Sequence, residues 1–174
     1  MTKRKETISL VTVQSEESLV VRAAREEDVQ TIYEMLRDSA AAQGDENALC
    51  VDPGSLREDG FLTRPPKYWC LLAEVDGRPA GLALYFCIYS TWTSRHQLYL
   101  EDLYVSSHFR RRGVARSLMI ELARIASVSG CPRIRWLVLR ENAAAIEFYQ
   151  SMGADLRPEW LNMSLERIAA IGSD

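Results

Sequence analysis

The chain has 174 residues, of which 47% are hydrophobic and 26% are charged, and its formal net charge is -3 at pH 7. This length and apolar content suffice for one domain with a buried core, and the net charge offers nucleic acid no general attraction. The basic start of the chain is not followed by an apolar run long enough for a signal peptide or a membrane span. We therefore expect a cytoplasmic protein that binds neither nucleic acid nor membranes.

The first elements of the chain are predicted to be an extension, a strand and a helix. Residues 1–18 carry no apolar period, which predicts a flexible N-terminal extension, and the domain is expected to span residues 19–174. Residues 19–23 resemble a strand. Residues 25–42 have apolar side chains at helical spacing and acidic residues in their first turn, which favours a helix.

The middle of the chain predicts a short helix followed by a hairpin. Pro53 suits the first turn of a helix over residues 53–59, and Gly60 is expected to end it. Two β-rich runs, residues 68–75 and 78–89, flank Asp76-Gly77. This dipeptide supplies the positive φ angles of a two-residue hairpin turn, so the two runs are predicted to pair.

The second half alternates strands with helices. Strands are expected over residues 96–105, 133–139 and 160–165, and helices over residues 114–129 and 142–152, the last with Asn142 as its cap. Hairpin strands followed by alternating strands and helices predict an α/β domain with a mixed, largely antiparallel sheet flanked by helices.

Cysteine and histidine spacing indicates neither disulfides nor a metal site. The four cysteines are scattered without a C-x-x-C pair, which favours free thiols in a reducing compartment. His96 and His108 lack ligand spacing to each other or to a cysteine, so no metal is expected.

A basic loop joins the strand that ends at Val105 to the helix that follows it. The N-terminus of a helix offers unpaired amides and a partial positive charge, so a phosphate can bind there, and Gly113 lets it approach the backbone closely. The arginines add fixed positive charge. A basic surface turn is the alternative. The candidate residues are Arg110, Arg111, Arg112, Gly113, Val114, Ala115 and Arg116.

Glu101 and Asp102 form a pair of carboxylates inside the strand predicted over residues 96–105. Because neighbouring side chains of a strand point to opposite faces, we expect one carboxylate on each face of the sheet. Two buried charges without partners would be costly, so the pair indicates either a site or a solvated, salt-bridged edge strand.

Two of these segments resemble the cofactor motifs of the GNAT superfamily of N-acetyltransferases. Arg110-x-x-Gly113-x-Ala115 is similar to its pyrophosphate signature, and the run from Asn142 to Tyr149, followed by Gly153-Ala154, is similar to its second motif. The resemblance is closest to the diamine (spermidine/spermine) and thialysine acetyltransferase branch. It is carried there by Trp92 and by residues 58–61, 70–75 and 98–105.

The resemblance implies a fold with a splayed acetyl-CoA cleft, a role for each candidate residue and a homodimer. It implies that Glu101 acts as a base through water and that Tyr149 is the general acid, although Tyr149 also suits simple core packing. Acetyl-CoA would lie along Leu103, Tyr104 and Val105, on the basic loop, and at Asn142 and Ala145. The acceptor would contact Glu101, Asp102, Trp92, Glu159 and Trp160, although Trp160 also suits core packing.

The sequence departs from the diamine branch after the first helix. Where that branch has a tyrosine and a glutamate, this chain has Ala42 and Gln43. A primary amine of a small cationic molecule, such as a diamine, a polyamine or a lysine analogue, is therefore the expected acetyl acceptor. A protein lysine or N-terminus is one alternative, and a regulatory module that binds acyl-CoA without turnover is another.

Overall fold

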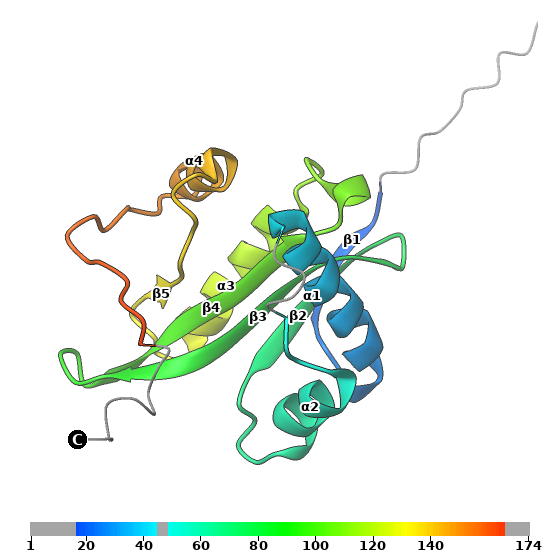
Figure 1. The fold of residues 1–174 in the computed structure, drawn as a ribbon, viewed down its shortest axis with the longest axis horizontal. Helices are drawn as coiled ribbons and strands as arrows, with labels where there is room; N and C mark the ends of the chain where they lie inside the picture. The colour runs from blue at the N-terminus through cyan, green and yellow to red at the C-terminus, as the bar shows by residue number, and fades with distance from the viewer. Residues whose placement is uncertain (1–16, 45–48, 166–174) are drawn as a thin grey trace, which may run out of the picture. The chain divides into compact units, whose positions relative to one another are not determined.

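A five-stranded sheet forms the centre of the fold (Figure 1). The computed structural model describes residues 17–44 and 49–165, so almost all of the predicted extension lies outside the described residues. The strands are β1 (Leu19–Ala23), β2 (Trp69–Val75), β3 (Arg78–Ser90), β4 (Arg95–Val105) and β5 (Ile134–Arg135). They lie in chain order, and only the β4–β5 pair is parallel, which confirms a mixed, largely antiparallel sheet.

The predicted hairpin of β2 and β3 is confirmed. Asp76 and Gly77 take φ angles of 50° and 73°, the left-handed values of a type I′ turn. Further along this pair, Gly81 allows close packing, since an added Cβ would lie 2.6 Å from the Tyr104 carbonyl oxygen and 3.1 Å from a Val114 methyl carbon.

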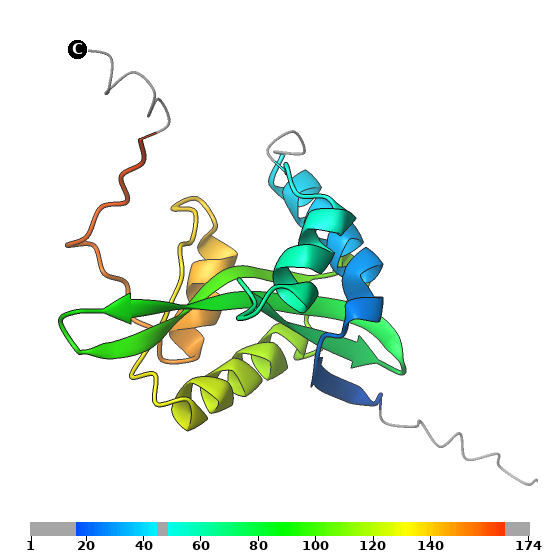
Figure 2. The ribbon, with the colours of Figure 1, turned by 90° about the horizontal axis from the view of Figure 1, so that it is seen from below.

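Helices cover both faces of the sheet. One face carries α1 (Val29–Gln43) and α2 (Pro53–Arg57), and the other carries α3 (Val114–Val128), as Figure 2 shows. Helices are therefore confirmed within residues 25–42 and 114–129, and one begins at Pro53 as expected. The core under α1 and α2 contains Ile32, Leu36, Leu56, Leu72 and Leu82.

Gly60 does not end the helix at residue 59, as the sequence led us to expect. The chain continues from α2 into a π-helical turn, Glu58–Leu62, that includes Gly60. The reason is close packing, since a Cβ on residue 60 would lie 2.5 Å from Cζ of Tyr68. The glycine therefore admits a tyrosine ring and is not a helix stop.

The chain divides into two compact units, Met1–Leu137 and Val138–Asp174. In the second unit, α4 (Ala143–Ser151) begins as predicted, with Asn142 Oδ1 accepting a hydrogen bond from the Ala145 amide at 3.1 Å. Two expected strands are wrong. The one over residues 133–139 reduces to β5, and residues 160–165 form no strand. Apolar patterning predicts burial, but a strand also needs a partner strand. Among the described residues, β5 pairs only with Leu98 and Tyr99.

Candidate active site

A β-bulge in β4 brings Glu101 and Asp102 to the same face of the sheet. Leu84 of β3 pairs with Asp102, but its neighbour Tyr85 pairs with Leu100, so Glu101 is an extra residue opposite no partner. Such a bulge interrupts the alternation of side chains. The expectation that the two carboxylates point to opposite faces is therefore wrong.

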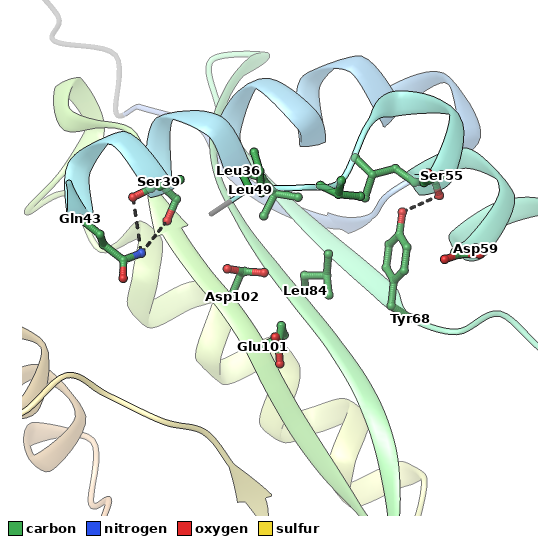
Figure 3. A pocket seen from close by; sticks show the side chains of 13 residues that line it. Leu36, Ser39, Gln43, Leu49, Ser55, Asp59, Tyr68, Leu84, Glu101 and Asp102 are labelled. Carbon is green, nitrogen blue, oxygen red and sulfur yellow. Dashed lines mark hydrogen bonds between the residues drawn. The ribbon is translucent and has the colours of Figure 1, made fainter. Parts of the chain in front are cut away.

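Both carboxylates line a cavity of about 290 Å³ under α1 and α2. Figure 3 shows Gln43 and Asp59 at its two ends, with Glu101 and Asp102 between them. The remaining wall is mostly apolar, and the lining residues outside this group are Leu36, Ser39, Ala40, Leu49, Val51, Ser55, Leu56, Tyr68 and Leu84. The cavity is thus an apolar pocket with a few carboxylates.

The electrostatics of the cavity favour a cation. Burial, and then the neighbouring Glu101 carboxylate, raises the pKa of Asp102 to about 6. Asp59 is the third carboxylate of the lining and pairs with Lys67 at 2.7 Å. No lysine or arginine is among the described residues that line the cavity, so Glu101 and Asp102 are not neutralised from within it.

Several cavity residues were not assigned a role from the sequence. Tyr68 is buried, and its hydroxyl donates to the Leu56 carbonyl oxygen at 2.7 Å. Of the two positions at which the sequence departs from the diamine branch, Gln43 lines the cavity and Ala42 does not. Asp59 belongs to residues 58–61, which carry part of the family resemblance. The sequence nevertheless predicted no role for its side chain.

Beyond the bulge, β4 presents an open edge. The parallel pairing with β5 stops at Tyr99, and no other strand of the described residues pairs with this edge. The Ser106 amide donates to the Ala80 carbonyl oxygen of β3 at 3.0 Å, so by alternation the amides of Leu103 and Val105 face the open edge. The Tyr104 backbone faces β3, which leaves Leu103 and Val105 to bind a ligand along this edge.

The loop between β4 and α3 has the backbone of an anion cradle. Arg111 and Gly113 both take left-handed φ angles, 62° and 80°. The first i to i−4 bond of α3 runs from the Ser117 amide to the Gly113 carbonyl oxygen, so the amides of Val114, Ala115 and Arg116 precede the ladder. These amides point out of the helix N-terminus, where an anion is stabilised.

The arginines of this loop are held by different contacts. Arg110 donates from Nε to the Val105 carbonyl oxygen at 3.2 Å. Arg112 pairs with Glu17 at 2.7 Å and lies over the Phe109 ring, 5.7 Å from its centroid. Arg110 thereby ties the loop to the open edge of β4. Arg111 in the loop and Arg116 in the first turn of α3 are exposed.

In the C-terminal unit, α4 carries Tyr149. Burial raises the pKa of the Tyr149 phenol, which keeps it protonated at neutral pH. Asn142 Oδ1 already accepts the Ala145 amide, so both candidate cofactor residues take part in the cap of this helix. The cap fixes the start of α4, and with it the position of Tyr149 on the helix.

Trp92, Glu159 and Trp160 are the remaining candidate substrate contacts, and Trp92 is not part of the cavity lining. Trp92 lies in the turn between β3 and β4 and is 94% exposed. Trp160 is 72% exposed, and Glu159 pairs with Arg157 at 3.3 Å.

Within the described residues, no group of three or more His, Cys, Asp and Glu side chains could hold a metal ion. Nor is any helix of this part of the chain long and apolar enough to cross a membrane.

Comparison with known proteins places this arrangement among acetyltransferases. The sequence pattern of the acetyltransferase (GNAT) family matches residues 29–154. The thialysine N-epsilon-acetyltransferase of Sus scrofa is 35% identical over 145 residues, which cover 79% of this chain and 84% of the relative. The spermidine/spermine N(1)-acetyltransferase-like protein 1 of Homo sapiens is 32% identical over 147 residues, covering 80% of this chain and 21% of that longer protein.

A solved structure also shares the fold. An integron cassette protein from the mobile metagenome of V. cholerae superposes with a TM-score of 0.71 at 23% identity, covering 88% of this chain and 96% of that one. At this identity the likeness concerns the fold alone.

Proposed function

Because the chain belongs to the acetyltransferase (GNAT) family, whose members use acetyl-CoA to acetylate amines, we propose that its acceptor is a small cationic primary amine bound in the cavity beside Glu101. The amine attacks acetyl-CoA directly in a ternary complex. The observation that carries this proposal is the bulge that brings two carboxylates to one pocket with no lysine or arginine in its described lining.

The pocket suits an alkyl ammonium. Its leucines and valines accept methylene groups, and Asp102 supplies negative charge at neutral pH, since its pKa of about 6 lies below 7. An alkyl ammonium has a pKa of about 10.4 and must lose a proton before it can attack. Glu101 is the exposed carboxylate of the pair, and it takes this proton through water.

The open edge of β4 and the basic loop suit acetyl-CoA as co-substrate. The amides of Leu103 and Val105 pair with the pantetheine arm as a strand would and stabilise charge on the thioester oxygen. The amides at the start of α3 bind the pyrophosphate, with Arg110, Arg111, Arg112 and Arg116 around them as fixed positive charge. No metal takes part in this proposed chemistry.

Tyr149 is the proposed general acid. Expulsion of the coenzyme leaves a thiolate whose conjugate acid has a pKa of about 8.5, and a phenol of pKa about 10 can return the proton. Burial raises the pKa of the Tyr149 phenol, so the proton that it would donate is present through neutral pH.

We also propose a cytoplasmic homodimer. The four cysteines are free thiols, which suits a reducing compartment. Trp160, Leu161 and Met163 expose large apolar side chains in the C-terminal unit, which suits a contact with a second copy. Light scattering on the purified protein tests the dimer, and a monomeric mass at micromolar concentration would rule it out.

The function is tested by thiol release from acetyl-CoA with a panel of amines: putrescine, cadaverine, spermidine, thialysine, lysine and a lysine peptide. Wild type is compared with Glu101→Gln and Tyr149→Phe, and each variant should lose about 10²- to 10⁴-fold in kcat while still binding acetyl-CoA. Turnover of the peptide alone would favour a protein acceptor. Coenzyme binding without turnover of any amine would favour a regulatory module.

A further inference from the structure

An arginine, Arg135, lies on the same face of the sheet as Glu101. Tyr99 precedes Glu101 by two residues, before the bulge interrupts alternation, so the two side chains share a face. Arg135 of β5 pairs with Tyr99, and paired residues of neighbouring strands also share a face. Glu101, Tyr99 and Arg135 therefore form a row on one side of the sheet.

The electrostatics of Tyr99 agree with this placement of the three side chains. Burial raises the pKa of the Tyr99 phenol, the Glu101 carboxylate raises it further, and the Arg135 guanidinium lowers it. Both charges thus act on one ring. The Tyr99 ring also stacks on Phe86 with 5.1 Å between centroids, which provides an apolar surface between the two charges.

Arg135 has no carboxylate partner among the residues that the structure describes. It is exposed. Strand geometry puts the Cα atoms of Glu101 and Arg135 roughly 8 Å apart, two residues along β4 and one strand across. Both side chains can therefore reach one small ligand that carries an ammonium at one end and a carboxylate at the other.

We propose that Arg135 is a specificity-determining residue that binds the carboxylate of an amino-acid acceptor whose side-chain amine lies at Glu101. The inference rests on the proposed function of the cavity. The guanidinium makes a bidentate, charge-assisted pair with the carboxylate, and the methylene chain of the acceptor lies on the ring of Tyr99. A diamine of the same length lacks the group that Arg135 binds.

The test compares lysine with cadaverine, which differ only by the carboxylate. In wild type, kcat/KM is expected to be higher for lysine. Arg135→Gln should lower kcat/KM for lysine about 10- to 100-fold, leave cadaverine within about threefold, and act mainly on KM. Arg135→Lys should restore part of the loss. Arg124→Gln is the matched control, since Arg124 is an exposed arginine of α3 on the other face of the sheet.

Calorimetric binding of lysine in the presence of coenzyme A separates this inference from the proposed function. Binding that depends on Arg135 supports the inference even if no amine is acetylated. If Arg135→Gln changes lysine and cadaverine equally, or if wild type uses cadaverine and neither binds nor acetylates lysine, the inference is overturned while the amine acetyltransferase stands. Absence of both turnover and lysine binding overturns both.

Discussion

Glu101 and Asp102 follow one another in β4, yet both side chains line the cavity under α1. A regular strand would send one of them into the layer under α3. The bulge instead places two negative charges side by side, which makes ionisation of Asp102 in the folded protein unfavourable. Burial and then the Glu101 carboxylate therefore raise the pKa of Asp102 to about 6.

The first prediction concerns this unfavourable ionisation. A carboxyl whose pKa is raised by folding destabilises the fold once it ionises, so the cost is absent below the unfolded pKa of 3.8 and complete above about 6. We expect Asp102→Asn to be more stable than wild type by up to about 3 kcal/mol at pH 7.5 and equally stable at pH 3. Urea unfolding at both pH values measures the difference. Glu101→Gln should stabilise less, and equal stability of Asp102→Asn and wild type at pH 7.5 would contradict the prediction.

The second prediction concerns the ion pairs that join β1, β2 and the start of α1. Arg22 donates to both carboxylate oxygens of Asp28, at 2.7 and 2.9 Å, and to Glu74 at 2.6 Å. The Arg22 side chain lowers the pKa of Asp28, so its stabilisation is present above the unfolded pKa of 3.8 and is lost as the pH falls below it.

Asp28→Asn is therefore expected to lose about 2 kcal/mol of unfolding free energy at pH 7, with a smaller loss at pH 3. Denaturant titrations at the two pH values check this. Glu27→Gln is the control, because Glu27 pairs with Arg25 at an exposed site, and its removal should cost less than about 0.5 kcal/mol. A loss for Asp28→Asn that does not depend on pH would exclude the charge as its cause.

The third prediction concerns the loop proposed to bind the cofactor, and it separates the effect of backbone conformation at Gly113 from the effect of steric crowding there. Gly113 has φ of 80°, and nothing lies within 4 Å of an added Cβ, so a substitution there is strained without a clash. Gly113→Ala should cost about 1–2 kcal/mol and weaken coenzyme A binding, with Gly113→Asn milder. Gly130→Ala, at φ of 68° and equally uncrowded after α3, should cost similar stability with unchanged affinity. Equal affinity losses for Gly113→Ala and Gly130→Ala would remove the loop from the cofactor site.

The fourth prediction concerns the wall of the cavity. A Cβ at residue 60 would lie 2.5 Å from the Tyr68 ring, so Gly60→Ala must displace a buried tyrosine. We expect a loss of about 1–3 kcal/mol and a higher KM for the amine, with coenzyme affinity unchanged. Tyr68→Phe removes only the hydrogen bond to Leu56 and should cost about 1 kcal/mol. An unchanged KM in Gly60→Ala would show that Tyr68 does not shape the acceptor site.

The sequence by itself determined the features that depend on neighbouring residues. The turn at Asp76-Gly77 requires only two left-handed φ angles, and the start of α4 requires only a side chain such as Asn142 within reach of an amide. The helices α1 and α3 follow from apolar side chains at helical spacing. The loop proposed to bind the cofactor belongs to the same group, because a glycine and a helix start suffice to present free amides.

Only the tertiary structure decided which side chains share a face and which strands find partners. The bulge at Glu101 is defined by how β4 pairs with β3, and the length of β5 is set by where its pairing with β4 stops. An apolar pattern in the sequence contains neither kind of information. The row from Glu101 to Arg135 joins segments more than thirty residues apart in the chain. Local propensity acts over a few residues, whereas register and cavity walls are set by contacts between distant segments, and these decide which side chains line the proposed acceptor site.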